Sequence, residues 1–169
     1  SFVFLFISFV SLEAKEVEKN YTVKTKGITI GNLNWQVKLE QDTYTTSINL
    51  NSKGPLSLVY KFKGYYETSG IIQKGILVPN RYIQEWKTKN KQRNINLVFK
   101  KNKIVDLKIQ PEEKEVERIN FLELEGYSDP LTSFLNIFLN NLDSKTIDGR
   151  RIYVLSPNKS KDYTKVLIK

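Results

Sequence analysis

Residues 95–109 read INLVFKKNKIVDLKI, which is two alternating apolar runs on either side of a polar tetrapeptide. Ile95, Leu97 and Phe99 alternate in the first run, and Val105, Leu107 and Ile109 alternate in the second. Because successive side chains of a strand point to opposite faces of a sheet, this period of two predicts a pair of half-buried strands. The tetrapeptide at 100–103 then forms the tip of a hairpin, so the stretch predicts antiparallel β structure.

Similar runs recur in both directions along the chain at intervals of about 8–12 residues, a spacing typical of a sandwich or a barrel. We expect further strands over residues 21–26, 33–39, 44–50, 56–62, 65–69, 81–89, 150–155 and 163–168. Turn-forming residues separate these runs, notably at 51–55, 90–91 and 148–149. The segment 77–80, which contains Pro79 and Asn80, is also interpreted as a turn.

One segment has the periodicity of a helix. Its apolar residues recur at intervals of three and four: Leu131, Phe134, Leu135, Phe138 and Leu142. The opposite, exposed face would carry Asn136, Asn140 and Asn141. Asp129 is a favourable N-cap and Pro130 suits the first turn, so we expect a helix over about 130–142. The predicted fold is mainly β: a strongly curved antiparallel sheet or half-open barrel of about nine or ten strands with one covering helix.

The chain begins with a nearly unbroken apolar run from Phe2 to Val10. This run is shorter than the about 20 residues that a membrane-spanning helix needs, and it has the length of the apolar part of a secretory signal peptide. We expect residues 1–14 to be a signal peptide that lacks its first residues, since there is no methionine, with cleavage after Ala14. Residues 15–169 would then form one exported β-rich domain. The alternative is that the apolar run is a buried N-terminal strand.

The residue types exclude several kinds of catalytic site. The chain has no histidine and no cysteine, which excludes Ser-His-Asp triads, thiol nucleophiles and zinc sites built from histidine or thiolate. A Ser-Lys pair or a pair of carboxylates remains, and the candidate carboxylates are Glu67, Glu85, Asp106, Asp129 and Asp148. No calcium-loop spacing or phosphate-binding glycine motif is present in the sequence. We therefore expect no catalytic residues, no metal and no cofactor, and a hydrolase ranks behind two non-enzymatic hypotheses.

The net charge is +9, from 22 lysines and 5 arginines against 18 acidic residues. A basic set near predicted hairpin tips comprises Arg81, Lys87, Lys89, Lys91, Arg93, Lys100, Lys101 and Lys103. Compositional bias explains this charge better than phosphate recognition, which usually relies on arginine, and lysines also protect edge strands from aggregation. An exported protein rarely meets nucleic acid, so we expect no nucleic-acid partner. If the basic surface is functional, its partner would be an anionic lipid or glycolipid of the envelope.

The predicted elements bring apolar side chains to the concave face of the sheet. The residues assigned to this inner face are Trp35, Val37, Leu39, Leu58, Tyr60, Phe62, Leu131, Phe134, Leu135 and Phe138. Walls of aliphatic and aromatic side chains suit an acyl chain better than a sugar or a nucleotide. The hypothesised ligand site consists of Trp35, Tyr60, Phe62, Phe134 and Phe138, with Arg150 and Arg151 for an acidic head group. In the alternative, the same residues fill a closed core and the protein is a structural or assembly partner of an envelope protein.

Four short segments occur in an order that resembles a known family. They are GITIG at 27–31, LVPNRY at 77–82, DPLT at 129–132 and DGRRIY at 148–153. On these segments the chain resembles the domain-of-unknown-function 3108 family of exported proteobacterial proteins over roughly residues 20–168. The resemblance implies a periplasmic protein with no established activity and no known catalytic residues. It also implies a curved sheet with one helix, similar to the lipoprotein carriers of the periplasm.

Overall fold

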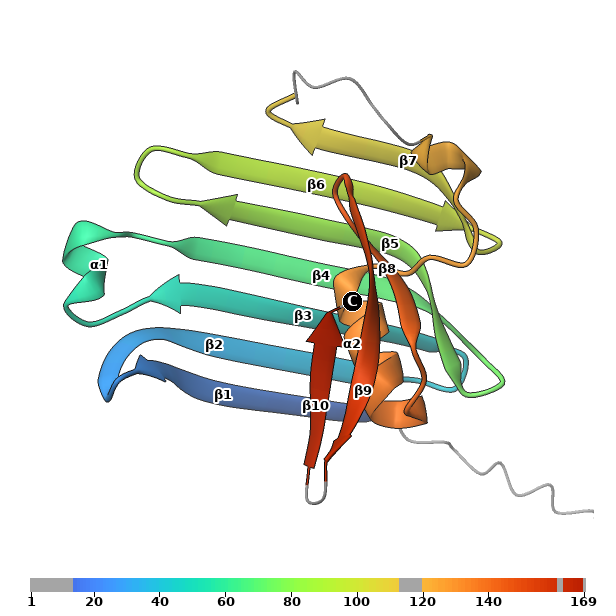
Figure 1. Ribbon diagram of the computed structural model, residues 1–169, viewed down its shortest axis with the longest axis horizontal. Helices are drawn as coiled ribbons and strands as arrows, with labels where there is room; N and C mark the ends of the chain where they lie inside the picture. Colours follow the sequence, from blue (N-terminus) through green and yellow to red (C-terminus); the bar gives the residue numbers. More distant parts are fainter. Residues whose placement is uncertain (1–13, 113–119, 161–162, 169) are drawn as a thin grey trace, which may run out of the picture.

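The computed structural model describes residues 14–112, 120–160 and 163–168. Its main layer is a seven-stranded antiparallel sheet in which each strand pairs with its neighbours in sequence (Figure 1). The strands are β1 (Lys15–Thr25), β2 (Ile28–Leu39), β3 (Thr43–Ser52), β4 (Lys63–Gln73), β5 (Ile76–Lys87), β6 (Gln92–Lys100) and β7 (Lys103–Gln110). This meander confirms the antiparallel pairing that the alternating runs predict.

Tight turns join neighbouring strands where the residues tolerate a left-handed backbone. Lys26 and Gly27, between β1 and β2, have φ angles of 45° and 80°. Lys101 and Asn102, between β6 and β7, have φ angles of 50° and 62°, so the hairpin tip predicted at 100–103 is confirmed. Positive φ at both central residues is the geometry of a type I′ turn, whose twist matches that of the strands it joins.

The segment 77–80, which we expected to be a turn, lies inside β5. The register between β4 and β5 shifts just before Gly70 and leaves one extra residue in β5. This bulge accommodates Pro79, which cannot donate a hydrogen bond to a neighbouring strand. Gly70 is required opposite, because a Cβ there would lie 2.1 Å from the carbonyl oxygen of Val78. The strand predicted over 81–89 is therefore the second half of a longer one.

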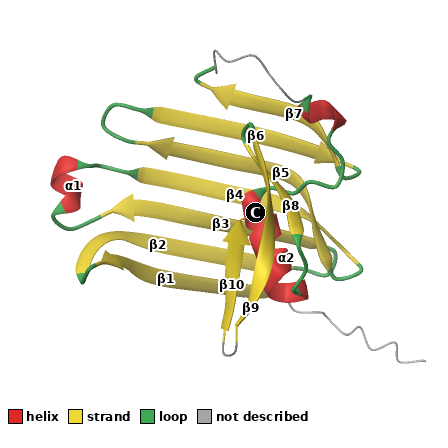
Figure 2. Ribbon diagram, in the orientation of Figure 1, coloured by secondary structure: helices red, strands yellow, loops and turns green. Residues whose placement is uncertain are grey.

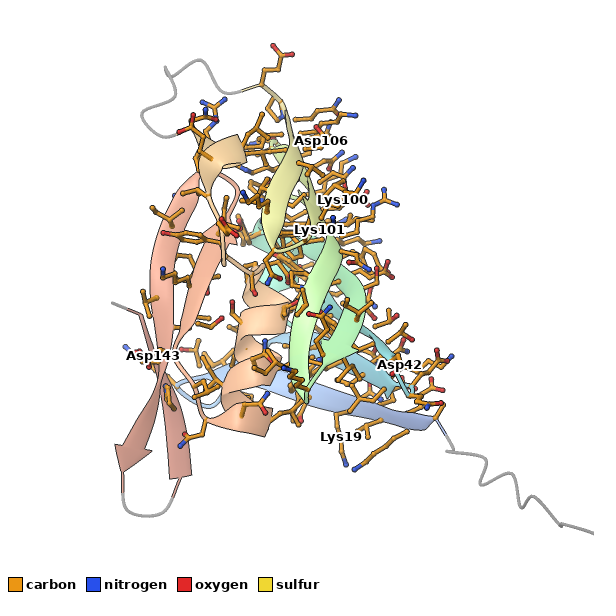
Figure 3. The ribbon with its side chains drawn as sticks, turned by 90° about the vertical axis from the view of Figure 1, so that its right-hand side faces the viewer. Lys19, Asp42, Lys100, Lys101, Asp106 and Asp143 are labelled. Atoms are coloured by element: carbon orange, nitrogen blue, oxygen red, sulfur yellow. The ribbon has the colours of Figure 1, made fainter. Side chains whose placement is uncertain are left out.

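A second, three-stranded sheet has the order β10-β9-β8 and runs across the strands of the first (Figure 2). Its strands are β8 (Ser144–Asp148), β9 (Arg151–Ser160) and β10 (Tyr163–Ile168). Helix α2 (Pro130–Asn140) lies between the two sheets (Figure 3). The predicted fold class, mainly β with a curved antiparallel sheet and a covering helix, is confirmed, and the sheet does not close into a barrel. The division of ten strands between two sheets lay beyond the prediction.

Helix α2 begins at the predicted residue, Pro130, and ends at Asn140, two residues before the predicted end. The Asp129 side chain caps its N-terminus by accepting hydrogen bonds from the backbone N–H groups of Leu131 and Thr132, both at 3.0 Å. At the other end, Asn141 adopts the left-handed conformation with φ of 54°, and its N–H donates to the carbonyl oxygen of Ile137. These two caps define the helix.

The face of α2 that packs against the sheet differs from the predicted one. Asn136, which we assigned to the exposed face, is buried: its Nδ2 donates to the Leu77 carbonyl oxygen at 2.8 Å, and the Leu77 N–H donates to its Oδ1 at 2.9 Å. Leu77 lies before Arg81, the first residue of β5 that pairs with β6, so the Asn136 amide takes the place of a neighbouring strand there. As a result Ile137 is only 1% exposed, whereas Phe138 and Leu142 are both 53% exposed. The predicted burial of Phe138 and Leu142 was wrong.

The strand predicted over 56–62 is also wrong. These residues form a short helix, α1 (Leu56–Val59), and a loop that leads into β4. Ser57 holds the turn before the helix, because its N–H and its hydroxyl both donate to the carbonyl oxygen of Gly54, at 3.0 and 2.7 Å. Leu58 consequently faces solvent rather than the core. The alternation in this segment belongs to an exposed connection between β3 and β4.

The predicted signal peptide lies almost wholly outside the described residues, which begin at Ala14. Strand β1 starts at Lys15, the residue that we expect to begin the exported domain. None of the helices in the described part of the chain is long and apolar enough to cross a bilayer.

Candidate functional site

The face of the large sheet toward α2 carries the core and is only partly covered. One group of buried side chains is Tyr82, Ile95, Leu97, Phe99, Ile104, Ile109, Phe121, Leu131 and Ile147, and a second is Tyr44, Leu77 and Leu135. Helix α2 and the second sheet lie over the half of the sheet nearer the β2–β3 and β4–β5 turns (Figure 1). No described element lies over the half nearer α1, so this face offers both a packed core and an open area.

An apolar groove runs along β1 and β2 beside the C-terminal half of α2. Its volume is about 220 Å³, and its lining residues are Lys15, Val17, Lys19, Tyr21, Trp35, Val37, Leu39 and Leu139. Strand pairing brings these residues together, since Val17 lies opposite Val37 and Lys19 lies opposite Trp35. The walls are aliphatic and aromatic apart from the two lysines and the ends of the tyrosine and tryptophan rings. Such walls fit an apolar chain with an acidic end.

Three of the predicted ligand-site residues meet beside this groove. The Trp35 indole N–H donates to the Thr46 hydroxyl at 2.9 Å, which fixes the ring on the inner face. The Phe134 ring centroid lies 5.7 Å from that of Trp35, and the Phe138 ring lies edge-on to Phe134 at 4.7 Å. Trp35, Phe134 and Phe138 therefore form one aromatic cluster between β2 and α2, in which Phe138 is half exposed.

Phe62 lies elsewhere on the inner face, and Tyr60 lies outside it. The Phe62 ring stacks on that of Trp86 with centroids 6.4 Å apart. Gly64 leaves room for this packing, because a Cβ there would lie 2.9 Å from the rings of both Phe62 and Tyr66. Tyr60 is exposed in the loop after α1, so its predicted position on an inner-face strand was wrong. Phe62 and Trp86 belong to the open half of the face near α1.

Arg150 and Arg151 belong to the β8–β9 hairpin and do not line the groove. Gly149 packs the hairpin turn against the large sheet, because a Cβ there would lie 3.1 Å from the Ile95 side chain. Asp148 lies opposite Arg151 in the hairpin. Burial raises the pKa of Asp148, and the charge of Arg151 opposes that shift. The basic groups along the groove are Lys15 and Lys19, so the structure does not bring Arg150 and Arg151 together with Trp35, Phe134 and Phe138.

The family model described as "Protein of unknown function (DUF3108)" matches residues 20–166. The chain belongs to the DUF3108 family. A search of curated proteins and a search of solved structures each found no match.

The segments that resemble the DUF3108 family all lie where the backbone turns, bends or begins a helix. Residues 27–31 make the β1–β2 turn and the start of β2, and 77–82 contain the bulge of β5. Residues 129–132 cap α2, and 148–153 make the β8–β9 turn. In this DUF3108 protein these segments have structural roles, and the groove is lined by residues outside them.

Asp129 is a fully buried carboxylate that ties α2 of this DUF3108 protein to the sheet. Besides capping the helix, its Oδ2 accepts hydrogen bonds from the hydroxyls of Thr68 at 2.8 Å and Thr132 at 2.5 Å. The Thr132 hydroxyl lies 2.6 Å from that of Tyr44. Burial raises the pKa of Asp129, and the hydrogen bonds from Thr132 and Thr68 oppose this shift. The network joins α2 to β3 and β4 and holds the wall of the groove in position.

Two grooves on the opposite face of the large sheet have a more polar lining than the groove beside α2. They share Glu85 and Asn94, which pair across β5 and β6. Lysine, asparagine and glutamine side chains make up most of their remaining lining. Charged and amide groups of this kind lose hydrogen bonds to water when an apolar molecule covers them, so these grooves do not suit the predicted class of ligand.

Several residues that line the groove were not predicted from the sequence. In residues 15–21 the inward positions are Lys15, Val17, Lys19 and Tyr21, and only one of them is aliphatic. A strand so rich in charge shows no clear apolar alternation, so the first strand was expected only from 21. Leu139, by contrast, lies four residues after Leu135, and this spacing could have identified it.

Proposed function

We propose that this DUF3108 protein is a periplasmic binding protein without enzymatic activity, which holds an acyl-chain-like ligand in the groove between β1, β2 and α2. The observation that carries the proposal is the lining of that groove, where Val17, Val37, Leu39 and Leu139 meet the Trp35 ring. Removing apolar surface from water contributes roughly 25 cal/mol per Å², so a chain laid along these side chains is stabilised without polar anchors.

The lysines of the groove suit an acidic head group. Lys15 and Lys19 are both exposed and line the groove together with the apolar residues. A carboxylate or phosphate beside them gains an attraction that salt screens, whereas burial of the chain does not depend on salt in this way. The proposed binding therefore has a salt-sensitive part and a salt-insensitive part.

The proposed location outside the cytoplasm rests on the N-terminal sequence. The apolar run from Phe2 to Val10 has the length of a signal-peptide core, and Ala14 suits the cleavage position. The first strand of the domain begins at Lys15, directly after that position. Cleavage after Ala14 would therefore release the domain with all of its described strands.

A second candidate function is supported by the surface next to the groove. Phe138, Leu139 and Leu142 are each more than half exposed at the end of α2. An accessory protein of the envelope could use these side chains to contact a partner protein while its core holds no ligand. The two candidates differ in whether a small apolar molecule enters the groove.

Titration with a fluorescent fatty acid separates the candidates. We expect saturable binding, and we expect Leu139→Asp to weaken it by roughly tenfold or more, because the substitution replaces apolar contact with a carboxylate that repels the acid. Leu139 is 54% exposed, so the substitution is expected to leave the fold intact. Substituting both groove lysines, Lys15→Gln and Lys19→Gln, should remove most of the salt dependence of the binding.

Leu122→Asp is the matched control, since Leu122 is 57% exposed but does not line the groove. Its affinity for the fatty acid should equal that of the unmodified protein. Absence of saturable binding at low and at high salt would support the accessory function instead. Equal weakening by the two aspartate variants would show that the probe binds somewhere other than the groove.

A further inference from the structure

The connection between β3 and β4 presents apolar side chains to solvent at one end of the large sheet. In α1, Leu58 is 87% exposed and Val59 is 83% exposed, and the following residue, Tyr60, is 50% exposed. Ile28, at the start of β2 and at the same end of the sheet, is 55% exposed. Leaving aliphatic side chains in water is unfavourable, so this cluster of exposed apolar side chains indicates a surface that binds a partner molecule or a membrane.

The same end of the sheet carries many exposed lysines. Because a meander reverses alternately at its two ends, the β1–β2 turn, the β3–β4 connection and the β5–β6 turn all lie here (Figure 1). Their exposed lysines are Lys24, Lys26, Lys53, Lys61, Lys63, Lys87, Lys89 and Lys91. The three segments 24–30, 53–63 and 86–93 contain no acidic residue. Within these three segments the charged residues beside the exposed apolar side chains are all positive, although exposed Glu85 in β5 and exposed Glu112 after β7 also lie toward this end.

The opposite end of the sheet has mixed charge. The β2–β3 turn is flanked by Glu40 and contains Asp42, and Lys103 beside the β6–β7 turn forms an ion pair of 3.4 Å with Glu125. Lys100 and Lys101 lie at this end too (Figure 3). The basic set near the predicted hairpin tips is thus divided between two ends, and among the described residues it is the α1 end that places lysines beside aliphatic side chains more than 80% exposed.

We propose that the α1 end of the protein docks on an anionic lipid bilayer, with Leu58 and Val59 entering the region between the head groups and the acyl chains. Apolar side chains surrounded by lysines are the combination that binds such an interface, because burial drives the insertion and the lysines attract anionic head groups. Tyr60 suits the head-group level, where tyrosine is enriched.

The dimensions of the sheet allow all three lysine-bearing segments to reach one flat surface. Neighbouring strands lie about 4.8 Å apart, so the seven-stranded sheet is about 29 Å wide. The three segments therefore lie side by side at one end of the sheet. Docking by this end brings the open half of the inner face, with Phe62 and Trp86, close to the bilayer. The proposal does not require a ligand in the groove and is tested separately from it.

Vesicle co-sedimentation tests the contribution of charge. We expect the protein to bind vesicles of phosphatidylglycerol and phosphatidylcholine more tightly than vesicles of phosphatidylcholine alone, and to lose affinity at high salt. The double variant Lys53→Gln and Lys61→Gln should bind the anionic vesicles roughly 30-fold more weakly at low salt, at about fivefold per lysine. The double variant Lys100→Gln and Lys101→Gln has the same net charge but changes the opposite end, so its affinity should fall much less.

A single labelled position tests the insertion directly. Because the chain has no cysteine, Leu58→Cys introduces one thiol, which can carry an environment-sensitive fluorophore. We expect its emission to shift to the blue when anionic vesicles are added. The matched control is Leu122→Cys with the same label, since Leu122 is also exposed but lies on the short helix next to the β6–β7 end. Its emission should not change.

Three results would overturn the proposal: no binding to anionic vesicles, equal loss of binding from the two lysine double variants, or no blue shift at Leu58→Cys on vesicles that bind the protein. The first result would identify the exposed apolar end as a surface for a protein partner. The second and third would show that the positive charge of the whole chain, rather than this end, attracts the bilayer. Binding that depends on Lys53 and Lys61, with a blue shift at position 58 only, establishes the orientation.

Discussion

Asp129→Ala is expected to lower the free energy of unfolding by about 2–4 kcal/mol, because it removes both a helix cap and hydrogen bonds to a charged group. The carboxylate is fully buried and accepts four hydrogen bonds, from two backbone N–H groups and from the hydroxyls of Thr68 and Thr132. Urea denaturation measures the change. Asp143→Ala, at an exposed aspartate beyond the end of α2, is the control and should change stability little.

Asp129→Asn separates the cap from the charge. Its side-chain oxygen still accepts the backbone hydrogen bonds, so it should lose much less stability than Asp129→Ala. Burial raises the pKa of Asp129 in the folded protein above its ordinary value of 3.8. At a pH between the ordinary and the raised pKa, the folded protein therefore binds more protons than the unfolded chain. The free energy of unfolding should therefore fall as pH rises through that window, and this contribution should be missing from Asp129→Asn. Equal losses from Asp129→Ala and Asp143→Ala would contradict the structural role of the network.

Ile137→Ala is expected to destabilise the protein by about 2–5 kcal/mol, as is usual when a buried aliphatic side chain is truncated. Ile137 is almost completely buried on the face of α2 that packs against the sheets. Phe138→Ala should cost less, because the ring is half exposed. The main contact that it loses is the edge-on pair with Phe134, which contributes about 0.5–1.5 kcal/mol. Urea denaturation of the two variants side by side gives the ranking. A larger loss from Phe138→Ala would restore the helical phase that the sequence suggested and contradict the packing described above.

The sequence predicts the large sheet well because its strands are half buried. The hairpin at 95–109, the cap at Asp129 and the closing strand over 163–168 all follow from local patterns and are confirmed. Within the hairpin the predicted inward position of Val105 was wrong, because a bulge buries Ile104 instead and leaves Val105 48% exposed. The failures have physical causes of their own. The segment at 56–62 alternates like a strand, but Ser57 and Gly54 close a turn that makes a helix.

Tertiary contacts explain the error at Asn136. An asparagine on a helix is usually assigned to the solvent face, because burying an amide without partners is costly. Here the backbone of Leu77 supplies both partners, since β6 no longer pairs with β5 at that residue. No pattern within the helix itself could reveal an edge that a distant strand leaves open.

Only part of the candidate site could be predicted, because its other wall depends on which strands pair. Trp35, Phe134 and Phe138 come together because the period of the strand and that of the helix each bring them to the facing sides. The β1 wall was missed because its inward residues include Lys15 and Lys19, which look like a solvated strand in isolation. Their role along an apolar groove appears only when β1 is paired with β2.

Native mass spectrometry of the protein purified from the envelope fraction of its own cells tests the central proposal most directly. We expect a chain that starts at Lys15 and carries a lipid-sized adduct, which is released on collisional activation. The adduct should be lost from Leu139→Asp and kept in Leu122→Asp, which differ in position but not in the kind of change. A mature chain that is free of any adduct in the unmodified protein, or an adduct retained equally by both variants, would contradict an acyl-chain ligand in the groove between β1, β2 and α2.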